Sequence, residues 1–245
     1  MHISYLNFIR IFICSAIFLI GYVKTATAQT NELSGWAAWF HTQRFSKHWG
    51  ASFDGQFRSA HHADYLKNVL LRPNLNYYFG GNKSATLGYA YVSANGRTAT
   101  GGKTFRSENR IFEQFIISQK AGINTAITHR FRLEQRFLGA TPTQQEVFSQ
   151  RVRYFIRGVI PFNNEPTFTK GTFLALQNEV FANIQNNDKI NNHVFDQNRA
   201  YVALGYRFSN RMDIDAGYLN QYVQQTSAHT INHIAQIALY TRFGK

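Results

Sequence analysis

Charged and apolar side chains alternate in the segment 128–139, and this spacing is the clearest chemical signal in the chain. Every second residue is charged, at Arg130, Arg132, Glu134 and Arg136, and the residues between them are mostly Phe or Leu. Successive side chains of a strand point to opposite faces, so one face is charged and the other apolar. Arg presents a planar fork of donors that pairs bidentately with carboxylates, and an Arg left unpaired attracts anions.

The same alternation recurs through most of the chain and gathers charge on one face. The basic residues on the charged parity are all Arg, namely Arg58, Arg72, Arg110, Arg130, Arg132, Arg136, Arg151, Arg153, Arg157, Arg199 and Arg207. The acidic residues on that parity are Asp54, Glu108, Glu134, Glu179, Asp213 and Asp215. Strands with one apolar and one charged face are typical of a barrel whose apolar face meets lipid. The charges would then line a lumen with a charge near +5.

Three functions fit a lumen of this kind. In the first, interleaved ion pairs fill a narrow barrel, which has a structural or surface-interaction role. We expect Glu108, Glu134 and Glu179 to pair there with Arg from neighbouring strands. In the second, unpaired Arg residues line a narrow, anion-preferring pore. Barrels of about eight strands are filled by their own side chains and those of about sixteen are open, so a mostly occluded lumen is expected.

In the third, the barrel is a lipid-modifying hydrolase, which requires a nucleophile and a base within hydrogen-bond reach. Several His and Ser residues are available, but no spacing joins a Ser to a His and a carboxylate in a recognisable motif. The available His residues are His41, His48, His129, His229 and His233. We interpret most of them as interfacial or loop residues. The pair His61-His62 with Asp64 could hold a metal, but adjacent side chains on an extended chain point apart. We therefore expect no catalysis, metal or cofactor.

Eleven segments have the alternation of a strand. They are residues 35–44, 48–58, 68–79, 85–93, 108–120, 123–138, 148–160, 172–184, 197–208, 212–223 and 231–243. Single-chain bacterial barrels have even strand numbers, so we expect an all-β, antiparallel, up-and-down transmembrane barrel of ten or twelve strands. Pro73 lacks a ladder donor and predicts a bulge or a strand end. Glu113 and Asn178 fall on the apolar parity, and Glu113 predicts a register shift or an interfacial depth.

The connections between these segments alternate between short and long. Such alternation is typical of outer-membrane barrels, with short periplasmic turns and long extracellular loops. The connection 162–170 is longer than this rule predicts on its side. The long loops 95–107 and 185–193 are the expected contact surface for a partner.

The first 28 residues have the features of a cleaved secretory signal. Arg10 precedes an apolar run at 11–23, which is short for a membrane-spanning helix, and Ala26-Thr-Ala28 is a cleavage motif. The alternative is an N-terminal membrane anchor. Cys14 is the only cysteine and lies in this segment, so the mature chain, residues 29–245, would have neither a disulfide nor a thiolate metal site. No other stretch is apolar over the 18 or more residues of a transmembrane helix.

The mature chain would be basic, with 24 Lys and Arg against 13 Asp and Glu and a formal charge of +11. Export and inward-facing Arg argue against nucleic acid as the partner. The expected partners are outer-membrane lipid and lipopolysaccharide, and the barrel-assembly machinery during insertion. The sequence leaves the oligomeric state open.

Several short segments resemble an uncharacterised family of bacterial outer-membrane β-barrels, a domain of unknown function. These segments are Arg72-Pro-Asn-Leu-Asn-Tyr77, Leu87-Gly-Tyr-Ala-Tyr91, Glu108-Asn-Arg110, Arg132-Leu-Glu-Gln-Arg136, Arg151-Val-Arg-Tyr154, Asn178-Glu-Val-Phe181, Gln197-Asn-Arg199 and Gly217-Tyr-Leu-Asn-Gln221. The resemblance implies an outer-membrane barrel of a Gram-negative bacterium. It implies no activity, and no catalytic residue can be carried over from it.

Overall fold

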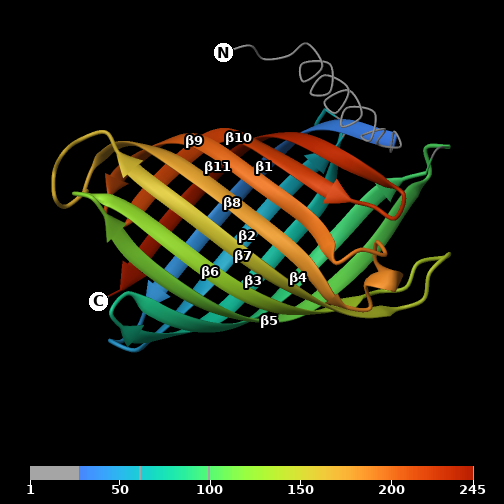
Figure 1. Ribbon diagram of the computed structural model, residues 1–245, viewed down its shortest axis with the longest axis horizontal. Helices are drawn as coiled ribbons and strands as arrows, with labels where there is room; N and C mark the ends of the chain where they lie inside the picture. Colours follow the sequence, from blue (N-terminus) through green and yellow to red (C-terminus); the bar gives the residue numbers. More distant parts are fainter. Residues whose placement is uncertain (1–27, 61, 99, 245) are drawn as a thin grey trace, which may run out of the picture.

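Eleven strands and one short 3-10 helix form a closed barrel (Figure 1). The computed structural model describes residues 28–60, 62–98 and 100–244. In order, the elements are β1 (Ala28–Arg44), β2 (Trp49–Ala60), β3 (Tyr65–Gly80), β4 (Lys83–Arg97), β5 (Lys103–Ala121), β6 (Thr125–Leu138), β7 (Val147–Pro161), β8 (Gly171–Gln185), η1 (Asn187–Lys189), β9 (Phe195–Ser209), β10 (Met212–Gln224) and β11 (Ala228–Gly244). No helix in the described part of the chain is long and apolar enough to cross a membrane. The expected signal peptide lies outside the described residues, apart from Ala28.

The barrel closes through a parallel pair, and this corrects the expected strand number. Consecutive strands are antiparallel, whereas β1 runs parallel to β11, from Ala28 opposite Ala228 to Arg44 opposite Gly244. Eleven strands replace the expected ten or twelve because the even-number rule assumes antiparallel closure. A parallel ladder is only slightly less stable per residue, and it leaves no unpaired edge. The first strand is also longer than the expected segment 35–44, with 17 residues.

The two ends of the barrel differ in their connections. One end, the short-turn end, carries the turns 45–48, 81–82, 122–124 and 210–211. Positive φ angles at Gly80, Gly81 and Asn82 make one of these turns tight, a conformation that Gly and Asn adopt most readily. The short-turn end also carries the longer connection 162–170. The other end, the long-loop end, carries the remaining connections, η1 and the start of β1. The expected loop 95–107 proves to be mostly paired strand, because β4 and β5 extend to Arg97 and Lys103.

The connection 162–170 is long because part of it fills the lumen. Phe168 is buried and lies edge-on to Phe173, with ring centroids 6.0 Å apart. Arg207 Nη1 donates a hydrogen bond to the Phe168 carbonyl oxygen at 2.9 Å. The segment is therefore a short inward plug at the short-turn end.

Strand alternation places large apolar side chains on the outer wall and charged ones inside. On β6, Phe131 is 48% exposed, whereas Glu134, three residues away and on the other parity, is among the most buried side chains. Leu87 on β4 and Leu204 on β9 are similarly exposed on the outside. The outer wall is therefore apolar, whereas the lumen is lined by charged and polar side chains.

Two expected irregularities are absent. Pro73 lies within β3, opposite Phe53 on β2, and the register between these strands is unbroken there. Its ring faces outward, and the residue has no ladder partner on β4. Glu113 lies on β5 without a register shift and points outward. Gln135 Nε2 donates to Glu113 Oε2 at 3.1 Å, so an amide rather than a bulge accommodates the carboxylate.

Candidate functional site

Three neighbouring strands, β5, β6 and β7, supply most of the charge in the lumen. The ladder places Glu134 on β6 opposite Arg151 on β7, and Arg132 opposite Arg153. Like charges directly opposite each other destabilise a sheet. Arg132 and Arg153 therefore require a carboxylate beside them, and the alternation on β6 supplies one two residues along, at Glu134.

Glu134 is the centre of the lumen's ion pairs and is only 1% exposed. Its Oε1 atom lies 2.5 Å from Arg153 Nη1, and its Oε2 atom lies 2.7 Å from Arg151 Nη2. Arg132 Nη1 and Arg110 Nη1 lie farther away, at 3.5 and 3.8 Å. Four guanidinium groups thus share one buried carboxylate, which gives this part of the lumen a net positive charge.

Glu108 and Asp196 extend the cluster toward the long-loop end. Glu108 accepts two hydrogen bonds from Arg110, at 2.8 and 2.9 Å, and one from Arg136 Nε at 2.6 Å. Asp196 Oδ2 lies 2.6 Å from Arg151 Nη1. Asp196 was outside the predicted strand 197–208, and an irregularity in the β8/β9 register turns it inward.

Glu179 on β8 extends the cluster in the other direction. Its Oε1 atom accepts from Arg153 Nη2 at 2.6 Å and from Arg130 Nη2 at 2.7 Å. Arg132 also has a neutral partner, because its Nε and Nη2 atoms donate hydrogen bonds to Gln114 Oε1. We call the connected set the Glu134 layer, which comprises Glu108, Arg110, Arg130, Arg132, Glu134, Arg136, Arg151, Arg153, Glu179 and Asp196.

Arg157 and Arg199, which the sequence also places on the charged parity, lie apart from this layer. Arg157 pairs with Asp215, 2.6 Å from Nη2 to Oδ2, and the same carboxylate accepts from the Tyr201 hydroxyl at 2.7 Å. Arg199 faces Glu179 across the β8/β9 ladder, but within the described residues it makes no ion pair. Its Nη2 atom donates instead to Gln197 Oε1 at 3.1 Å.

Apolar side chains pack the lumen below the layer. Phe173 on β8 is 1% exposed and lies over Gly205 on β9, where an added Cβ would be 2.2 Å from the ring. Phe112 on β5 lies over Gly88 on β4 in the same way. The glycines leave room for the rings, so aromatic groups occupy the interior. One buried cluster contains Phe168, Phe173, Ala175, Tyr201, Ala203, Leu219 and Ile234, and it extends to Trp36, which also lines the cavity on the long-loop side.

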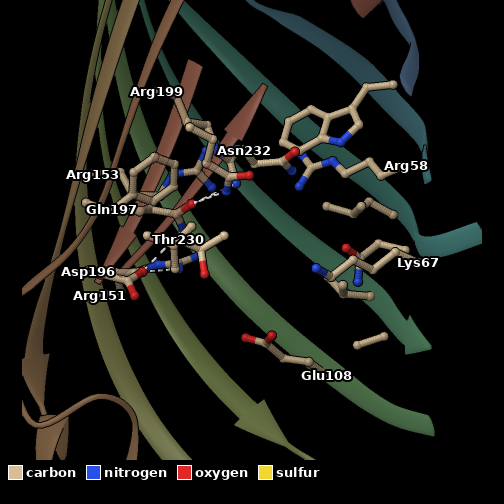
Figure 2. A pocket seen from close by; sticks show the side chains of 18 of the residues that line it. Arg58, Lys67, Glu108, Arg151, Arg153, Asp196, Gln197, Arg199, Thr230 and Asn232 are labelled. Atoms are coloured by element: carbon tan, nitrogen blue, oxygen red, sulfur yellow. Dashed lines mark hydrogen bonds and ion pairs between the residues drawn. The ribbon is translucent and has the colours of Figure 1, made fainter. Parts of the chain in front are cut away.

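Above the layer, on the long-loop side, a cavity of about 330 Å³ remains, which we call the vestibule (Figure 2). Lys67 and Glu32 form an ion pair on its wall at 3.2 Å, and the Lys67 side chain is 41% exposed. The basic residues of the vestibule are Arg58, Lys67, Arg72, Arg110, Arg136, Arg151, Arg153 and Arg199, and the acidic ones are Glu32, Glu108 and Asp196. The walls are therefore strongly cationic.

Two of these basic groups share an aromatic ring in place of a carboxylate. The guanidinium carbon of Arg58 lies 3.9 Å from the Trp36 ring centroid, and that of Arg199 lies 5.2 Å from it. Cation–π contact of this kind stabilises a guanidinium without neutralising its charge. The sequence predicts that Arg58 faces the lumen, but it does not predict its contact with Trp36. Strand parity alone does not tell which inward side chains meet.

Within the described residues, the candidate catalytic His side chains do not form a set with a nucleophile and a carboxylate. His129 and His233 lie on the outer parity and contact the hydroxyl groups of Tyr154 and Tyr218, at 2.8 and 2.6 Å. His41 contacts Thr241. No group of three His, Cys, Asp or Glu in the described residues could hold a metal ion, although His61 lies outside them.

The chain belongs to a family described as "Protein of unknown function (DUF2490)", whose model matches residues 33–232. The matched region runs from β1 into β11 and contains the Glu134 layer and every residue that lines the vestibule except Glu32. Neither the curated proteins nor the solved structures contain a significant match to this chain.

Proposed function

We propose that this protein is an outer-membrane β-barrel of a Gram-negative bacterium, exported by a cleaved signal at residues 1–28. Its role would be structural or in surface interactions, with a lumen that does not conduct. The observation that supports a closed lumen is the Glu134 layer above a packed aromatic interior. Ion pairs at 2.5–2.8 Å around Glu134, Glu108 and Glu179 link inward side chains of the neighbouring strands β5, β6, β7 and β8.

Several features support the location in a membrane. The outer wall carries large exposed apolar residues on every strand, and the barrel has no open edge. The orientation follows from the connections, with the short-turn end in the periplasm and the vestibule at the cell surface. Residues on this side could contact lipopolysaccharide, and the barrel-assembly machinery would insert the chain.

Fractionation and electrophoresis test the location. We expect the protein in the outer-membrane fraction, with a faster-migrating band when the sample is not boiled. Recovery as a soluble periplasmic protein with no heat-modifiable band would rule out the proposed class.

Single-channel recording tests the closed lumen. In planar bilayers the wild-type protein should pass no current, and Phe173→Ala together with Phe112→Ala should produce conductance by removing rings from the interior. Steady, anion-selective current through the wild type would favour the second candidate, a narrow anion pore. The observation that favours this second candidate is that Arg58 and Arg199 have no ion-pair partner among the described residues.

We also propose that the protein is not an enzyme, because its His side chains contact hydroxyl, amide or carbonyl groups rather than a carboxylate, at His41, His48, His129, His193 and His233. Incubation with phospholipid and lipid A should release no acyl chains. Release that survives purification and disappears when His129 or His233 is replaced would instead establish a hydrolase.

A further inference from the structure

Arg58 and Arg199 differ from the other Arg residues of the vestibule in their partners. The remaining five each lie within 4.0 Å of a carboxylate oxygen. Arg58 and Arg199 make no such ion pair with any described residue, and each donates only to a glutamine side chain, Gln56 or Gln197. Arg58 is nevertheless 7% exposed. A buried charge without a counter-ion is costly, so this arrangement requires a compensating role.

The free donors of the two Arg converge from different walls. Arg58 comes from β2 and Arg199 from β9, and Trp36 on β1 lies between them. In Figure 2 the two side chains extend from opposite sides of the vestibule toward Asn232 on β11. Asn232 uses its Oδ1 atom to accept from Ser34. Among the described residues, its amide N–H groups have no hydrogen-bond partner, and neither do the Nη1 groups of the two Arg residues.

We propose that Arg58, Arg199 and Asn232, arranged around Trp36, form a binding site for a phosphate group. Donors on three separate strands suit an anion with three non-coplanar terminal oxygens better than a planar carboxylate with two. Two unpaired guanidinium groups match the double negative charge of a phosphate monoester. The phosphate could belong to a soluble ester or to a lipid headgroup, and both present the same chemistry. This site goes beyond the proposed function and does not depend on whether the barrel conducts.

Trp36 provides a direct measure of binding. The other two tryptophans, Trp39 and Trp49, lie on the outer parity and are exposed. In a Trp39→Phe/Trp49→Phe background, purified in detergent, emission would come from Trp36 alone. Titration with inorganic phosphate, glucose 6-phosphate and lipid A in mixed micelles should change this emission saturably. Acetate at the same ionic strength should not.

Single substitutions assign the effect to the two Arg. Arg58→Gln and Arg199→Gln should each weaken phosphate binding by about ten- to 100-fold, the range for losing one charged hydrogen-bonding partner. Arg106→Gln is the matched control: it removes the same charge at the same end, but Arg106 donates to Gly139 and Gln144 outside the vestibule. Its affinity should equal that of the parent.

The outcomes separate the two sources and can overturn the site. Equal binding of inorganic phosphate and glucose 6-phosphate supports a soluble ester, and binding of lipid A alone supports a headgroup. The proposal is wrong if all three phosphates leave the emission unchanged, if acetate binds as well as phosphate, or if Arg106→Gln weakens binding as much as the other variants. Circular dichroism and the heat-modifiable band confirm that each variant is folded.

Discussion

The Glu134 layer and the vestibule contain the same kind of side chain in opposite electrostatic situations. In the layer, Arg153 binds two carboxylates, with 2.5 Å to Glu134 and 2.6 Å to Glu179. In the vestibule, Arg58 and Arg199 lie against one indole ring, and neither forms an ion pair with a carboxylate of the described residues. Paired Arg residues link neighbouring strands through ion pairs, whereas the unpaired ones keep hydrogen-bond donors that are free to bind a ligand. Removal of charge should therefore destabilise the first region and spare the second.

The largest expected effect is at Glu134. Glu134→Gln leaves four guanidinium groups around a neutral amide, and breaking a buried pair costs about 3–5 kcal/mol. We expect the free energy of unfolding to fall by that amount in urea titrations of protein folded into lipid vesicles. Glu113→Gln is the control, because it makes the same chemical change on the outer wall, where an amide is the partner. Equal losses from both variants would show that the layer does not stabilise the barrel.

Gly205→Ala should have the second largest effect, because it tests packing instead of charge. The added methyl group would lie 2.2 Å from the Phe173 ring, so the ring must move. Overpacking of this kind costs about 1–3 kcal/mol. Gly158→Ala provides the comparison, since an added Cβ there meets no atom within 4 Å. The same urea titration should show a loss only for Gly205→Ala, and a loss at Gly158 alone would contradict the described interior.

A smaller effect of opposite sign is expected on the outer wall. In the proposed membrane location, Glu113 points toward lipid, and an acidic residue there destabilises by less than the roughly 2–4 kcal/mol of a lipid-facing Arg or Lys. Glu113→Leu should therefore raise the free energy of unfolding in bilayers by about 1 kcal/mol. Lower stability of this variant would indicate that Glu113 contacts a protein partner instead of lipid.

The smallest effect is expected in the vestibule. Arg58→Gln removes a buried charge with no carboxylate partner, so stability measured without phosphate should change by less than about 0.5 kcal/mol or rise slightly. A loss as large as that of Glu134→Gln would remove the distinction between the two regions.

The sequence predicted strand content well and closure poorly. All eleven segments with alternating parity correspond to strands, and the charged parity of 130, 132, 134 and 136 faces the lumen. Alternation is a local property of two faces, so it can be read from neighbouring residues. The first strand was placed at 35–44 and begins at Ala28, because its first part is held by a parallel ladder to β11, nearly 200 residues away. Local patterns contain no information on that partner.

The sequence by itself determined which side chains face inward and that Arg outnumbers acid among them. Only the tertiary structure decided which Arg residues are paired. Glu134 meets Arg from three strands because the ladders align them, whereas Arg58 and Arg199 meet at Trp36 because closure through β1 and β11 brings β2 and β9 to the same part of the lumen. Parity follows from the period of one strand, but pairing depends on the register and curvature of the whole barrel.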